Sequence, residues 1–127
     1  MGAGFGSLPI GNDTALLNIV TSTNIACGLH AGDWDVMAVA VAGDVGGGVH
    51  PVFPDLQGFC RRRMDIAGEN LGNLVRHQLG MVRAIARAAG GQVQHIKLHG
   101  ARSVNPEIIG MVLARTAQPF SRRAPFA

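Results

Sequence analysis

Three histidines in this chain occupy the same position in a recurring pattern. His30, His50 and His99 each follow one bulky apolar residue at the end of a strand-like run, and each precedes a loop that contains glycine or proline. Parallel α/β sheets place their active sites at the carboxyl ends of the strands. An imidazole can transfer protons near neutral pH or bind a metal ion. We therefore expect the three side chains to converge at one end of a sheet and to act in catalysis.

Carboxylates follow two of these histidines closely. Asp33 comes shortly after His30, and Asp55 comes shortly after His50. A carboxylate beside a histidine can orient a general base or support a metal ligand, so we predict catalytic roles for both. Each also has a structural interpretation, because Asp33 is well placed to cap a helix and Asp55 can brace a proline-containing turn.

Further polar residues share a sheet face with the histidines. Side chains two residues apart on a strand point the same way, which groups His95 and Lys97 with His99, and Asn24 with His30. His95 also fits a hydrogen-bonded core histidine. For Lys97, a functional position and a solvent-exposed one are about equally compatible with the pattern.

The elements that must position these residues alternate between strands and helices. A capping residue and an apolar stripe mark the helices, and glycines punctuate the chain. This order predicts an α/β fold with about three βα units on a parallel sheet. A closed barrel needs about eight strands and about 250 residues, so the sheet is either small and open or part of a larger barrel. We expect strands over 23–30, 46–50 and 93–99, helices over 14–20, 34–44, 68–89 and 106–116, one domain over 1–117 and a frayed tail over 118–127.

Composition excludes several classes of protein. The chain has 127 residues, of which 47% are hydrophobic and 15% charged, and this fits one packed domain. Its net charge of +3 is scattered and aromatic residues make up 5%, so nucleic-acid binding is not expected. The longest apolar stretch is far shorter than the ~20 residues of a membrane helix, and the beginning does not resemble a signal peptide. Cys27 and Cys60 are too few for a disulfide scaffold, which favours a cytoplasmic protein with both thiols in packing roles.

The sequence around the histidines resembles the LamB/YcsF family, the family of the A subunit of ATP-dependent 5-oxoprolinase. The matching blocks are 21–33, 50–62 and 94–101. The resemblance implies a partial (β/α) barrel of the glycoside hydrolase and deacetylase type. It also implies the conversion of 5-oxoproline to glutamate coupled to ATP hydrolysis, with subunits B and C as partners. Ala3 stands where the family has a glutamate, and Arg102 departs from the family pattern, so we expect a copy truncated at both ends.

That reaction suggests a role for each candidate residue. Opening a lactam requires a base that activates water, a proton donor for the leaving nitrogen, and cations for carboxylate and phosphate groups. ATP with Mg²⁺ is the implied cofactor, and no metal held by the chain itself is expected. The resemblance implies proton transfer by His30, Asp33, His50, Asp55 and His99, and binding of substrate or phosphate by Asn24, Arg61, Arg62 and Lys97.

Two other interpretations remain open. The same histidines can serve as zinc ligands in a metal-dependent deacetylase or amidohydrolase. Alternatively, the chain is a non-catalytic remnant that keeps the fold. An incomplete barrel leaves at least one sheet edge with unpaired N–H and C=O groups, so we also expect self-association through that edge or docking on a partner.

Overall fold

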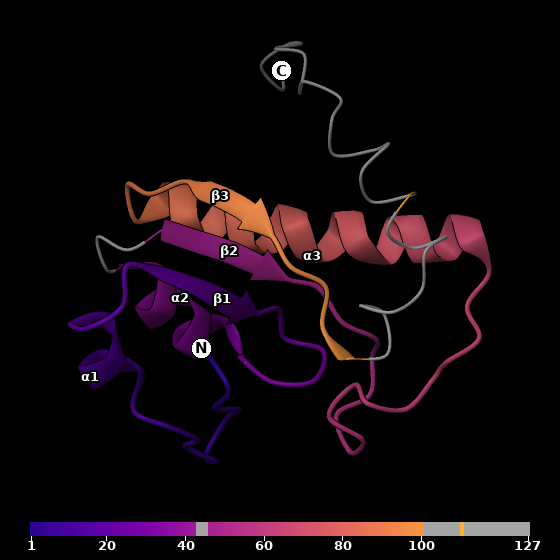
Figure 1. Ribbon diagram of the computed structural model, residues 1–127, viewed down its shortest axis with the longest axis horizontal. Coiled ribbons are helices and arrows are strands. Elements are labelled where there is room, and N and C mark those ends of the chain that lie inside the picture. Colours follow the sequence, from indigo (N-terminus) through magenta and orange to yellow (C-terminus); the bar gives the residue numbers. More distant parts are fainter. Residues whose placement is uncertain (43–45, 101–109, 111–127) are drawn as a thin grey trace, which may run out of the picture.

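The structure is a computed structural model that describes residues 1–42, 46–100 and 110. The predicted tail over 118–127 lies outside this part, and so does the predicted helix over 106–116 apart from Gly110. The elements in chain order are α1 (Asp13–Leu17), β1 (Ser22–Ala26), α2 (Trp34–Ala42), β2 (Gly46–His50), α3 (Gly68–Ala88) and β3 (Val93–Ile96) (Figure 1).

A parallel sheet in the order β1-β2-β3 confirms the predicted α/β fold. Helices α2 and α3 connect successive strands, and both lie behind the sheet in Figure 1. Ile25 of β1 and Val49 of β2 are neighbours in the register and point toward these helices. There they pack with Met37 of α2 and Val82 of α3, all at most 1% exposed. The main core therefore occupies one face of the sheet, and the opposite face is left for other residues.

A second apolar cluster lies beneath the loops at the carboxyl ends of the strands. Its buried members are Val52, Phe53, Cys60 and Leu71. Leu29, immediately before His30, and Leu98, immediately before His99, pack against it. The bulky residue before each of these histidines thus anchors the loop that carries the histidine.

Strand β1 is shorter than predicted. It ends at Ala26, and His30 lies on the following loop rather than at a strand end. The cause is local, because Gly28 has a φ of +79° and Gly32 a φ of +76°. This left-handed conformation favours glycine and interrupts the extended backbone. The N–H of Gly28 donates to the carbonyl of Ala31 at 2.9 Å and closes a turn.

The helices largely follow the predicted pattern. Helix α3 agrees with the expected range to within one residue, whereas α1 is shorter than the predicted 14–20. Asn12 caps α1, since its side chain accepts from the N–H of Ala15 at 3.1 Å. None of the helices in the described ranges is long and apolar enough to cross a membrane.

The two edges of the sheet differ. Beside β1, the α-amino group of Met1 donates to the carbonyl of Asn24 at 2.6 Å, and the N–H of Ala26 donates to the carbonyl of Met1 at 3.1 Å. This is the bonding pattern of a parallel strand pair. Within residues 1–42 and 46–100, no strand pairs with the outer edge of β3. Self-association through that edge stays a prediction.

Candidate active site

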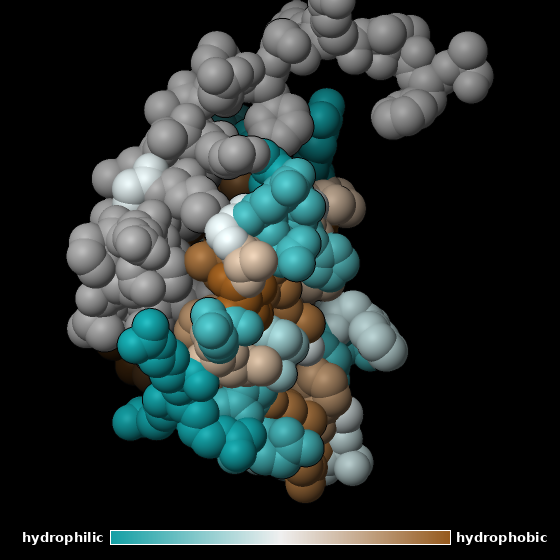
Figure 2. Space-filling view, turned by 90° about the vertical axis from the view of Figure 1, so that its right-hand side faces the viewer, coloured by the Kyte–Doolittle hydropathy of each residue, from teal (hydrophilic) through white to brown (hydrophobic). Residues whose placement is uncertain are grey.

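Three imidazole rings meet at the carboxyl end of the sheet, as predicted. The ring centroids of His50 and His99 are 4.6 Å apart, and those of His30 and His99 are also 4.6 Å apart and stacked. His30 and His50 are 6.5 Å apart. Figure 2 views the molecule from the side toward which the strands run, and shows hydrophobic residues exposed among hydrophilic ones. The convergence is confirmed, whereas the catalytic roles of these residues stay predictions.

A proline explains how the His50 ring is oriented. Beyond Ile96 the ladder between β2 and β3 continues in part, because the N–H of Lys97 donates to Val49 and that of His99 donates to Pro51. The regular parallel pattern would also have residue 51 donate to the carbonyl of Lys97. Pro51 has no N–H, so β3 ends at Ile96 rather than at the predicted His99. The Nδ1 of His50 takes the vacant place, 2.6 Å from the Lys97 carbonyl oxygen.

His99 is held between a ring and a carbonyl. Its Nδ1 lies 2.6 Å from Nε2 of His50, and its Nε2 lies 3.1 Å from the carbonyl oxygen of Phe59. Both Phe59 and Cys60 have positive φ values, 51° and 57°. Such values are uncommon outside glycine and turn the backbone sharply. The turn presents the Phe59 carbonyl to His99.

A buried carboxylate organises this turn. Asp55 is 4% exposed and forms a two-point ion pair with Arg62, whose Nε donates to Oδ2 at 3.1 Å and whose Nη2 donates to Oδ1. Asp55 also accepts from the N–H of Gly58 at 3.0 Å. The hydrogen bond from Arg62, helped by Gly58, holds the pKa of the Asp55 carboxyl below its usual value. The predicted bracing role is confirmed, and these contacts occupy both oxygens of the carboxylate.

His30 is the most enclosed ring of the cluster. It is 4% exposed and meets the Phe59 ring edge-on, with the two ring centroids 4.8 Å apart. Its Nδ1 is buried and makes no hydrogen bond with any described residue. Burial, together with repulsion by His99 and His50, lowers the pKa of His30 to about 4. Burial is also the main cause that lowers the pKa of His50 to about 4. Both rings are therefore neutral at physiological pH and can accept protons.

Asn24 and His95 form a second polar contact on the same sheet face. Nε2 of His95 lies 3.0 Å from Oδ1 of Asn24, although these residues lie on β3 and β1. Gly48 of β2 lies between them in the register, and a Cβ atom there would collide with the His95 ring. The absence of a side chain at position 48 thus allows the contact. The prediction that Asn24 and His95 share one face of the sheet is confirmed.

The other predicted site residues make different contacts. Asp33 caps α2, with Oδ1 accepting from the N–H of Val36 at 2.9 Å and Oδ2 from that of Gly6 at 2.6 Å. These two N–H groups, Val36 first, lower the pKa of Asp33. Arg61 and Lys97 are exposed near the cluster. In the described chain, the rings of His50 and His99 are oriented by carbonyls and by each other, not by the carboxylates that the spacing suggested.

Sequence reasoning missed Gln78 on α3. This fully buried side chain accepts from the N–H of Val52 at 2.8 Å and donates to the carbonyl of Val52 at 3.0 Å. It also donates to the carbonyl of Leu74 at 3.0 Å. Gln78 therefore fixes the backbone just after His50. The available signal was a polar residue within the apolar stripe of a helix.

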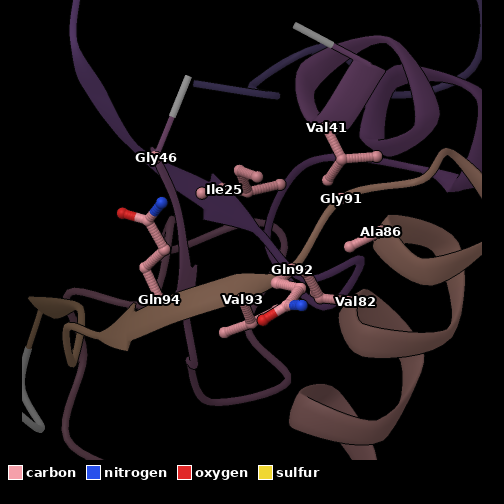
Figure 3. Close-up of a pocket in the computed structure, with 10 residues that line it drawn as sticks. Ile25, Val41, Gly46, Val82, Ala86, Gly91, Gln92, Val93 and Gln94 are labelled. Atoms are coloured by element: carbon pink, nitrogen blue, oxygen red, sulfur yellow. The ribbon is translucent and has the colours of Figure 1, made fainter. Parts of the chain in front are cut away.

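A cavity of about 260 Å³ lies at the opposite end of the sheet. Apolar side chains from β1, α2, α3 and β3 surround it, together with Gln94 of β3 and the preceding Gln92 (Figure 3). No titratable side chain lines it, so the chemistry that the histidines offer is located elsewhere. In the described ranges, no group of three or more His, Cys, Asp or Glu residues is arranged to hold a metal ion.

Comparisons with known proteins agree with the resemblance in the sequence. The A subunit of 5-oxoprolinase from Ruegeria pomeroyi is 50% identical over 141 residues, covering 93% of this chain and 56% of the relative. The protein of the same name from Methylococcus capsulatus is 50% identical over 105 residues, covering 80% of this chain and 40% of the relative. The chain thus spans about half the length of these curated relatives.

A solved structure supports the same fold. The crystal structure of a "Lactam Utilization Protein" from Thermus thermophilus matches with a TM-score of 0.78 and 33% sequence identity. The match covers 91% of this chain and 51% of that one, consistent with a partial barrel. Residues 1–108 also match the LamB/YcsF family as a whole. This chain belongs to the LamB/YcsF family.

Proposed function

We propose that this chain contributes the histidine cluster of a 5-oxoprolinase, the enzyme that cleaves 5-oxoproline to glutamate with ATP hydrolysis. Support comes from relatives that are named as the A subunit of this enzyme and from a similar protein described as acting in lactam utilization. The observation that carries the proposal is the hydrogen-bonded pair of His50 and His99, with His30 stacked on it. Lactam opening needs both a proton acceptor and a proton donor, and this cluster offers both.

The neutral rings suit the role of general base. Because the pKa values of His30 and His50 are lowered to about 4, both rings are neutral at neutral pH, and each keeps one nitrogen without hydrogen. A neutral imidazole accepts the proton of the attacking water, and an imidazolium returns a proton to the leaving nitrogen. Exposed Arg61 and Lys97 can attract the carboxylate of the substrate.

ATP with Mg²⁺ belongs to the proposal for the complete enzyme, but the two predicted carboxylates do not fit a Mg²⁺ site. Asp33 uses both oxygens to accept backbone N–H groups, and Asp55 uses both to bind Arg62 and Gly58. Neither is free to coordinate a cation. We therefore assign no step of the chemistry in this chain to the nucleotide.

Subunits B and C are the proposed partners, since the names of the relatives designate one lettered subunit and so imply a multi-subunit enzyme. A cytoplasmic location is part of the same proposal. Within the described ranges, Cys27 and Cys60 are thiols rather than halves of a disulfide, which suits a reducing compartment.

The test is an assay of glutamate release from 5-oxoproline with ATP, using this chain together with subunits B and C. His50→Ala should abolish release without loss of the folded circular dichroism spectrum, because His50 is the last residue of β2 and lies outside the main core. His77→Ala is the matched control, since His77 is exposed on α3. Equal loss in both variants would contradict the proposal.

The other interpretations predict different results. A non-catalytic remnant would bind subunits B and C without releasing glutamate. A deacetylase would retain stoichiometric zinc after dialysis and would act without ATP. Glutamate release that persists in His50→Ala would show that the cluster is not the site of the reaction.

A further inference from the structure

The hydrogen bonds of His50 and His99 require a particular number of protons. The carbonyls of Lys97 and Phe59 can only accept, so Nδ1 of His50 and Nε2 of His99 must each carry hydrogen. The contact of 2.6 Å between the two rings requires a further hydrogen. This makes three hydrogens, whereas two neutral imidazoles carry two between them. The complete chain of hydrogen bonds therefore forms only when the pair holds one positive charge.

The extra charge belongs on His99. His50 is the ring whose pKa is lowered to about 4, with burial as the main cause and repulsion by His99 and Lys97 adding to it. His50 thus stays neutral, donates from Nδ1 to Lys97 and accepts at Nε2. His99 then donates from both nitrogens, toward His50 and toward Phe59. An imidazolium needs two acceptors in this way.

Other charged groups face the pair from the neighbouring elements. The His30 ring stacks on His99 from the loop after β1. The α-amino group of Met1 and the side chain of Lys97 act on His50 from two further segments, and both disfavour a proton there. Repulsion therefore opposes the charge, and the two carbonyl acceptors favour it. Whether the pair keeps its charge depends on the position of the Phe59 carbonyl, because this acceptor belongs to a loop outside the sheet.

That loop is held in place by an ion pair. Asp55 binds Arg62 at two points and the N–H of Gly58 at one, and its own carbonyl accepts from the N–H of Cys60 at 3.0 Å. These contacts enclose Phe59 between fixed points on both sides. Arg62 has an exposed side chain and Asp55 a buried one, so the brace can be altered from the surface.

We propose that Asp55 and Arg62 are positioning residues, which hold the Phe59 carbonyl against His99 and so keep one extra proton on the His50–His99 pair. In the lactam cleavage proposed above, this proton goes to the leaving nitrogen. The N–H bond of the imidazolium breaks, an N–H bond of the released amine forms, and the pair becomes neutral. Only this last use rests on the proposed function.

The experiment follows the ring nitrogens of the ¹⁵N-labelled chain by two-bond ¹H–¹⁵N correlation between pH 4 and 9. While the pair holds its extra proton, the wild type should show His50 neutral with hydrogen on Nδ1, and His99 with hydrogen on both nitrogens. In Arg62→Ala, the midpoint of proton uptake by the pair should fall by about one pH unit, the scale set by a hydrogen bond to a charged group. In Arg62→Lys the midpoint should fall by less, because a cation remains beside Asp55, and Arg63→Ala should leave the midpoint unchanged.

The sign of the shift separates positioning from simple charge effects. Removing Arg62 leaves the Asp55 carboxylate without its cation, and by electrostatics alone this would raise the proton affinity of a nearby imidazole. A fall in the midpoint therefore supports loss of the hydrogen bond between His99 and the Phe59 carbonyl. A rise, or no change in a chain that keeps its folded amide spectrum, overturns the proposal. If Arg62→Ala does not fold, the partial shift in Arg62→Lys decides. If the assembled enzyme releases glutamate but the variants show no shift in the midpoint, the positioning role is overturned and the proposed function is not.

Discussion

Replacement of Gln78 by methionine tests how α3 holds the segment after His50. Methionine has nearly the same length, so it fills the space without the amide. The Val52 N–H and C=O, which now bond to the Gln78 side chain, would then be buried without partners. No other partner is at hand, because Gln78 is fully buried and Val52 is also 0% exposed.

The expected cost follows from these two groups. Each buried backbone group left without a partner costs about 1–3 kcal/mol, and the greater apolarity of methionine offsets roughly 1 kcal/mol. For the two groups together, the net loss in the free energy of unfolding should be about 1–5 kcal/mol, out of about 5–15 kcal/mol for a typical domain. The middle of this range corresponds to a fall in Tm of roughly 10 °C.

Two measurements check this reasoning. Urea denaturation should show a lower midpoint with an unchanged slope, because the surface exposed on unfolding is the same. Hydrogen exchange should speed up at the Val52 amide before it changes at Ile25 in β1. Gln57→Met is the matched control, since Gln57 is exposed. A Gln78→Met chain within about 0.5 kcal/mol of wild type, the range of ordinary surface changes, would refute the bracing role.

Three further outcomes follow from the structure. Gly48→Ala should destabilise the chain by about 1–3 kcal/mol, the scale of overpacking, and should remove the His95 ring from its partner, which NMR of that ring would show. The free energy of unfolding should fall as the pH drops from about 6.5 to about 4, measured by urea denaturation. The reason is that the lowered pKa values of His30 and His50 make the unfolded chain bind more protons in this window; a flat profile would contradict this. Cys27, whose pKa burial raises to about 12, should react with a thiol reagent only after unfolding; rapid labelling of the native chain would show that it is accessible.

The sequence predicts the framework of this molecule well because the framework depends on periodic patterns. The apolar stripe of α3 is a property of neighbouring residues, and it is found. In β3 the predicted alternation holds for His95 and Ile96, whereas an irregularity in the pairing with Gly47 and Gly48 leaves both Val93 and Ile96 packed on the main core. The convergence of His30, His50 and His99 follows from parallel strand order alone. It holds even though two of the three lie on loops.

The orientation of each ring could not be read from the sequence. It depends on backbone carbonyls, and these are the same in every residue type. Nothing in the sequence distinguishes the carbonyl of Phe59 from its neighbours, and only the two positive φ values bring it to His99. The spacing of Asp33 and Asp55 suggested carboxylate partners for the histidines. The local N–H groups and Arg62 are closer in the chain and bind these carboxylates instead.

Beside Pro51, a regular hydrogen bond of the sheet and the hydrogen bond of the His50 ring would compete for one oxygen atom, the carbonyl of Lys97. Any other residue at this position brings an N–H that matches the Lys97 carbonyl, and the ladder bond so formed would contribute about 0.5–1.5 kcal/mol. The same bond would displace the His50 ring from its acceptor. A search for stabilising substitutions would therefore favour replacing this proline, and would select chains with a longer third strand and a disordered histidine pair. In this molecule, the imperfection at the end of the strand is what keeps an acceptor available to a side chain.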